Sequence, residues 1–191
     1  MLDNDLSGSL PPTIGNWTSL QGISLGSNRL TSTLPDTIAN WQNLLVFDIG
    51  VQDTPNQTNN FTSSLPSTIG EAWSNLQIFS AFNNSLTGQL PGSLQAWTDL
   101  FYFDVSVNSF EGSLDFIGEW PQMQFFASHS NNFTGTIPQT ISSWRVIETA
   151  TFNDTALEGT VPSGICTVES LMTLTADCLS EVVCMCCSEC Y

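Results

Sequence analysis

Positive charge is nearly absent from this sequence. Its 191 residues include 18 acidic side chains but only two basic ones, Arg29 and Arg145, and no lysine, so the formal net charge is −16. A groove that binds nucleic-acid phosphates needs many arginine and lysine side chains, and an anionic membrane surface attracts the same residues. The composition therefore argues against nucleic acid and anionic membranes as partners.

Long apolar runs are missing as well. No stretch approaches the roughly 18 apolar residues of a membrane span, and the chain does not open with a signal peptide. Hydrophobic residues nevertheless make up 41% of the sequence, which is enough for a core. We therefore expect one folded domain or one repeat array, with no direct membrane insertion.

A short segment recurs along the chain, and Asn28 to Pro35 is one clear copy. Copies begin near positions 4, 28, 59, 84, 108, 131 and 155. The steps between them are nearly equal except for the second, which contains an insert at residues 51–58. Such a regular repeat is typical of a solenoid, in which stacked coils bury the apolar edge that a single coil leaves open.

Each period is predicted to form a strand followed by a bend. Apolar residues such as Phe103 and Val105 alternate with polar ones before the asparagine, which predicts a strand with one buried face. The asparagine amide can bond the backbone of neighbouring turns and form a ladder along the stack. A small residue and an apolar–proline pair then bend the chain. The ladder residues are Asn28, Asn59, Asn84, Asn108 and Asn131.

This pattern resembles the plant-type leucine-rich repeat, whose consensus runs leucine–x–x–leucine–x–leucine–x–x–asparagine–x–leucine–x–glycine–x–isoleucine–proline. Residues 20–35 show most of it, and the resemblance covers residues 1–178. It implies an α/β-type repeat solenoid, a right-handed superhelix of about seven coils over residues 1–165 with a parallel sheet on the concave side. The departures are Ser32 and Ser63 for glycine, Asp115 for proline and Thr155 for asparagine.

Tryptophan occupies one column of the repeat, at a nearly constant separation from the ladder position that precedes it. The consensus places an inward apolar residue there, so we expect the indoles to stack in the core on the convex side. The alternative is a groove of exposed indoles that binds a lipid or a sugar. The six residues are Trp17, Trp41, Trp73, Trp97, Trp120 and Trp144.

Cysteine occurs only near the C-terminal end of the chain, at Cys166, Cys178, Cys184, Cys186, Cys187 and Cys190. Two interpretations stay open: thiolate ligands for zinc, and a disulfide-rich cap over residues 166–191 that closes the last coil. The even count, the acidity and the glycosylation sequons favour the cap. The tail also resembles those of secreted leucine-rich-repeat proteins predicted in diatoms. Six cysteines allow 15 pairings, so the connectivity stays open.

The chain begins inside a coil. Met1 falls on the inward strand position that Leu25 occupies one repeat later, so we expect a fragment that lacks an N-terminal cap and a signal peptide. The disulfide cap and the sequons together predict an extracellular or cell-surface location. The glycosylation sequons are at Asn16, Asn56, Asn60, Asn83, Asn132 and Asn153.

Catalysis is not expected on the concave face. Ser80 and His129 lie two coils apart, roughly 10 Å at the parallel-strand spacing, whereas a nucleophile and its base need about 3 Å. Asp48 and Asp104 are equally far apart, near the upper limit for glycosidase carboxylates, on an open sheet where we expect no cleft that excludes water. We therefore expect that the protein is not an enzyme and has no cofactor. We also expect no metal site at His129, the only histidine of the sequence.

What remains on the concave face is a cluster of aromatic side chains with flanking polar groups. Exposed aromatics on a rigid scaffold indicate a contact surface, although the insert or glycans could instead cover part of it. We name this set the concave patch: Ile78, Phe82, Phe101, Tyr102, Asp104, Phe125 and His129.

Two functions of different classes follow. The first is an extracellular recognition module of receptor-like or secreted type that binds a protein, a peptide or a glycan. The second is an ice- or mineral-binding solenoid, and a structural cell-wall protein is a further alternative. The ice-binding surface would be a column of equivalent hydroxyl residues, Ser7, Thr31, Thr62, Thr87 and Thr134. Glu111 and Glu158 interrupt this column, so the sequence favours recognition.

Overall fold

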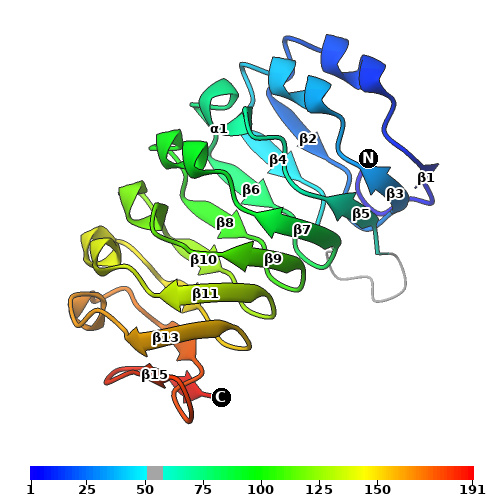
Figure 1. The fold of residues 1–191 in the computed structure, drawn as a ribbon. Helices are drawn as coiled ribbons and strands as arrows, with labels where there is room; N and C mark the ends of the chain where they lie inside the picture. The colour runs from blue at the N-terminus through cyan, green and yellow to red at the C-terminus, as the bar shows by residue number, and fades with distance from the viewer. Residues whose placement is uncertain (51–57) are drawn as a thin grey trace.

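The chain winds into a curved stack of coils, with its two ends at opposite ends of the stack (Figure 1). The computed structural model describes residues 1–50 and 58–191. Within these residues, the coils contribute strands to two parallel sheets, each of eight strands. Neighbours within a sheet are alternate strands of the sequence, because every coil passes once through each sheet.

The first sheet carries the strands that precede the asparagines. Its members are β2 (Gly22–Ser24), β4 (Val46–Asp48), β6 (Ile78–Ser80), β8 (Tyr102–Asp104), β10 (Phe125–Ala127), β12 (Thr149–Thr151), β14 (Thr173–Ala176) and β16 (Glu189–Cys190). The second sheet follows the asparagines. Its members are β1 (Ser7–Gly8), β3 (Arg29–Thr33), β5 (Asn60–Ser63), β7 (Ser85–Gln89), β9 (Ser109–Gly112), β11 (Asn132–Thr136), β13 (Ala156–Thr160) and β15 (Val182–Val183).

One short helix per coil covers the third side. Four of these helices start directly after a proline in extended conformation, whose fixed φ suits a helix entry. The 3₁₀ helices are η1 (Pro12–Asn16), η2 (Asp36–Asn40), η3 (Gly92–Ala96), η4 (Ile117–Glu119), η5 (Gln139–Ser143) and η6 (Ile165–Thr167). One coil has an α-helical turn instead, α1 (Ile69–Ala72).

The bend in the second sheet requires a left-handed backbone. Glycines occupy it in five coils with φ between 74° and 90°, as at Gly88 and Gly159. Serine stands there at Ser32 (φ 85°) and Ser63 (φ 70°), where the Cβ atom costs roughly 1–2 kcal/mol. These two coils therefore keep the shape of the repeat with an unfavourable residue.

The asparagines form the ladder that the repeat predicted. Asn131 accepts a hydrogen bond from the Phe110 N–H of the preceding coil (2.9 Å) and donates to the carbonyls of Val105 (3.0 Å) and Ser128 (3.1 Å). At the last copy, Asp177 lies beside Thr155 and accepts its N–H at 3.0 Å. Each ladder side chain thus ties two coils together through their backbones.

The tryptophan column lies in the core, as predicted, except at its first member. The indoles of Trp41 and Trp73 stack at 6.3 Å, and all members from Trp41 onward are fully buried. Trp17 is 47% exposed, because it lies in the first coil and has a neighbouring coil on one side only. Met1 takes the repeat position of Leu25, since the Asn28 amide bonds its carbonyl as the Asn59 amide bonds that of Leu25, and it is 67% exposed because no coil covers it.

Ring spacings explain the curvature. Successive indoles are 6.2–6.3 Å apart from Trp41 to Trp97, whereas the phenylalanines under the first sheet are 5.4–5.6 Å apart from Phe47 to Phe126. Each coil is therefore thinner at the first sheet than at the helical side. The stack must curve with the first sheet on its inner surface, and we call it the concave sheet.

All six cysteines form disulfides, so the structure supports the disulfide cap and not the zinc site. The pairs are Cys166–Cys186, Cys178–Cys190 and Cys184–Cys187. The bridged tail continues both sheets, since β15 pairs with β13 and β16 pairs with β14. The cap therefore covers the last coil with strands of its own.

Candidate functional site

The strand register of the concave sheet aligns outward-facing residues in rows along the stack. One row, here the hydrophobic row, contains Val46, Ile78, Tyr102, Phe125 and Thr149. The adjacent row, here the polar row, contains Ser24, Asp48, Ser80, Asp104, Ala127, Thr151 and Thr175. Both rows agree with the register read from the sequence, because every coil meets its neighbour without a shift in this sheet.

Two aromatic rings of the hydrophobic row stack on each other. The ring centroids of Tyr102 and Phe125 are 4.5 Å apart and their planes differ by 6°. Both side chains are half-buried. Partial burial, together with the nearby charges of Asp104 and Asp48, raises the pKa of Tyr102 to about 12, so its hydroxyl stays protonated and can donate a hydrogen bond.

A pocket of about 350 Å³ opens next to this stack. Val46, Ile78 and Tyr102 give it an apolar wall, and the polar row supplies the opposite wall. Val46 and Ser24 were not part of the predicted concave patch, although the strand register aligns them with Ile78 and Asp48. The lining residues are Ser24, Val46, Asp48, Ile78, Ser80 and Tyr102.

Two carboxylates stand on either side of Ser80 in the polar row. Asp48 accepts hydrogen bonds from the Ser24 hydroxyl (2.6 Å) and from the Gly50 N–H (3.1 Å). Asp104 accepts both of its hydrogen bonds from Ser106, from the N–H at 3.0 Å and from the hydroxyl at 2.5 Å. Both side chains are buried although they lie on the face of the sheet that points away from the core.

Burial shifts the pKa of Asp104, contrary to the sequence-based expectation. The pKa of Asp104 is raised to about 6. Desolvation is the main cause and the negative charge of Asp48 adds to it, whereas the hydrogen bonds from Ser106 oppose the shift. Asp104 is only 8% exposed. The expectation of an open, fully hydrated sheet was wrong because the inner curvature and the adjacent rows exclude water from this position.

The structure divides the predicted concave patch into two groups. Ile78, Tyr102, Phe125 and Asp104 lie within two adjacent rows of β6, β8 and β10. The remaining members are half-buried side chains outside these strands: Phe101 just before β8, and Phe82 and His129 in the segments after β6 and β10.

His129 contacts a neighbouring coil through its ring. Its Nδ1 lies 2.8 Å from the Thr151 hydroxyl. Burial lowers the pKa of His129, while the charge of Asp154 opposes the shift. Within residues 1–50 and 58–191 no three histidine, cysteine, aspartate or glutamate side chains are grouped for a metal ion. The same part of the chain contains no helix with the length and apolarity to cross a bilayer.

The predicted threonine column is wrong in detail. In the second sheet, Thr31 pairs with Asn60 and Thr134 pairs with Ala156 rather than with an equivalent threonine. Equivalent residues of neighbouring coils are offset by two positions, about 6.6 Å along a strand. The threonines therefore do not lie side by side on neighbouring strands, as the predicted column required.

The family comparison agrees with this architecture. A model described as "Leucine Rich Repeat" matches residues 19–41 and 75–97, each beginning just before the leucine that leads into a strand of the concave sheet. These two segments carry leucine-rich repeats. No curated protein matched the sequence.

Similar solved structures include plant receptors. The plant peptide hormone receptor RGFR1, in complex with RGF2, is 27% identical over 91% of this chain, with a TM-score of 0.82. The ectodomain of the membrane receptor kinase GASSHO1/SCHENGEN3 from Arabidopsis thaliana is 26% identical over 98% of this chain, with a TM-score of 0.83. This leucine-rich-repeat chain covers only 27% and 24% of those two chains.

Proposed function

We propose that this leucine-rich-repeat chain is an extracellular recognition module whose concave sheet binds a peptide or a protein. The observation that carries the proposal is the Tyr102–Phe125 stack beside the pocket on the concave sheet. Paired aromatics next to a hollow offer a large contact area at a small entropic cost. The two similar receptors are named for complexes with RGF2 and with CASPARIAN STRIP INTEGRITY FACTOR 2, which supports a peptide or protein as the ligand class.

An oxidising, extracellular setting is part of the proposal. Three disulfides in one small cap are typical of secreted proteins. We propose glycosylation at Asn16, Asn60 and Asn132, whose side chains are exposed. Asn83 and Asn153 are half-buried and are weaker candidates, and Asn56 lies outside the described residues.

Selection from a random library of short linear peptides on the folded chain tests the proposal. We expect peptides whose binding weakens by about 30-fold or more in both Tyr102→Ala and Phe125→Ala, since central aromatics contribute about 2 kcal/mol or more. Gln95→Ala is the control, because Gln95 is exposed on η3, outside the concave sheet. Peptides that bind both aromatic variants as they bind the wild type would place recognition elsewhere, and exclusive binding to a glycan array would change the ligand class.

A further inference from the structure

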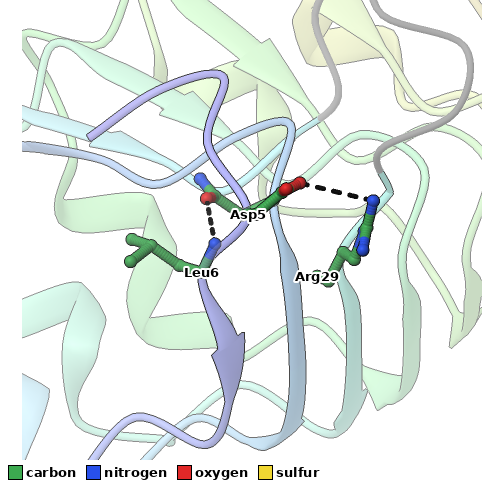
Figure 2. A network of polar contacts seen from close by, with 4 residues as sticks. Asp5, Leu6 and Arg29 are labelled. Atoms are coloured by element: carbon green, nitrogen blue, oxygen red, sulfur yellow. Dashed lines mark hydrogen bonds and ion pairs between the residues drawn. The ribbon is translucent and has the colours of Figure 1, made fainter.

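Asp104 is a buried carboxylate with no cation beside it. Its two recorded hydrogen bonds both reach Oδ1, and Oδ2 has no hydrogen-bond partner among residues 1–50 and 58–191. The chain has only two basic residues, and both lie elsewhere. Arg29 pairs with Asp5 at 3.3 Å at the N-terminal edge of the second sheet (Figure 2), and Arg145 is exposed after η5.

We infer that the concave pocket selects a cationic side chain of the bound peptide, an arginine, which inserts between Tyr102 and Asp48, next to the charge of Asp104. The inference rests on the proposed function and names the chemistry of its ligand. A net charge of −16 attracts cations to the whole molecule. Asp48 and Ser80 line the pocket. Asp104 does not line it, but it is the neighbour of Ser80 in the polar row, and its negative charge acts on Tyr102, which does line it.

The shape of the pocket suits a guanidinium group. Phe125 stacks on one face of the Tyr102 ring, whereas the pocket is lined by Tyr102 and not by Phe125. Tyr102 therefore contributes surface to the pocket that Phe125 leaves uncovered. A guanidinium stacks on an aromatic ring and pairs with carboxylates in the same plane. The volume of about 350 Å³ is at the lower end of the range for ligand pockets, about 300–1,000 Å³.

Binding is then pH-dependent. The direct neighbours of Asp104 in the polar row are Ser80 on β6 and Ala127 on β10, and neither titrates near neutral pH. The titratable groups that act on it electrostatically are Asp48 on β4 and Tyr102 on β8. A bound cation favours the ionised carboxylate, so affinity is full above about pH 7 and falls by up to about tenfold near pH 5, as Asp104 is protonated.

The test uses two small probes that differ in charge. Nα-acetyl-arginine amide and its neutral analogue Nα-acetyl-citrulline amide are titrated into the isotope-labelled chain, and the Asp104 carboxyl resonance is followed by NMR. We expect the arginine probe to bind at least about tenfold more tightly and to lower the pKa of Asp104. Asp104→Asn should reduce the preference to within about twofold. Glu148→Gln removes one exposed charge just before β12 and should keep it.

The outcomes separate this inference from the proposed function. Equal binding of the two probes, or an unchanged Asp104 titration in the wild-type chain, overturns the inference whether or not Asp104→Asn folds. Library peptides that depend on Tyr102 and Phe125 but contain no arginine would overturn the inference and leave the proposed function standing. An arginine preference without any peptide that depends on these aromatics would overturn the proposed function alone.

Discussion

Tryptophan has two structural roles at its position in the repeat, packing and hydrogen bonding. Its ring fills the wide side of the coil, and its indole N–H reaches the preceding coil, as in the bonds from Trp41 to the Ile14 carbonyl (3.1 Å) and from Trp120 to the Leu94 carbonyl (2.9 Å). Among the described residues, the indole nitrogens of Trp97 and Trp144 find no such partner. Packing, rather than the hydrogen bond, is therefore the contribution shared by all the buried members.

Trp97→Ala should destabilise the chain by about 3–5 kcal/mol, because it empties a fully buried site in the middle of the stack. Trp17→Ala is the matched control and should cost less than about 1 kcal/mol, since that ring is 47% exposed. Chemical denaturation followed by circular dichroism measures both values. Similar costs for the two variants would contradict the assignment of this column to the core.

Asp104 should make stability fall as the pH rises. Its folded pKa of about 6 lies above the ordinary value of 3.8, so the folded chain binds this proton more tightly than the unfolded chain. The contribution is present below about pH 4 and is lost as the pH rises through 6. Asp104→Asn keeps the Oδ1 acceptor and should remove up to about 3 kcal/mol of this pH dependence. Melting curves across this range, with the exposed Asp99→Asn as control, measure the difference.

At the scale of the element, the coil is held by its asparagine more than by its strands, which are short. Asn131→Ala should cost about 2–4 kcal/mol, because the Phe110 N–H and three backbone carbonyls lose a buried partner. Asn4→Ala should cost little, since the Asn4 side chain is exposed and bonds only the Leu2 carbonyl. Hydrogen exchange at the Phe110 amide reports the effect directly, and an unchanged protection factor would argue against the ladder.

The two sheets of one coil differ in how far the sequence predicts them. Residues before the asparagine pair without offset, so the rows of the concave sheet follow from the repeat length. In the second sheet, equivalent residues of neighbouring coils are offset by two positions, because the left-handed bend sets how each strand meets its neighbour. The repeat length alone does not predict this offset. The threonine column failed for this reason.

At the scale of the molecule, the solenoid should lose its C-terminal end first when the disulfides are removed. Cys166–Cys186 closes a loop across 20 residues and joins the cap to η6, whereas Cys184–Cys187 closes a much shorter loop within the cap. Replacing the long-range pair by serine should cost about 2 kcal/mol more than replacing the short one, because more chain entropy is released. Protection in hydrogen exchange should fall first in β13 to β16, since each coil contacts only its neighbours. Uniform loss along the stack would contradict this order.

The repeat, the direction of the apolar face, the ladder and the tryptophan core follow from the amino-acid sequence, because each depends on one period that every coil repeats. The pairing of the six cysteines, the offset of the second sheet and the pocket beside Tyr102 depend instead on how the coils pack in three dimensions. The same packing buries Asp104, whose pKa no local pattern could predict. Curvature arises from a spacing of 5.4–5.6 Å on one side of the coil against 6.2–6.3 Å on the other, and this difference exists only when coils pack together.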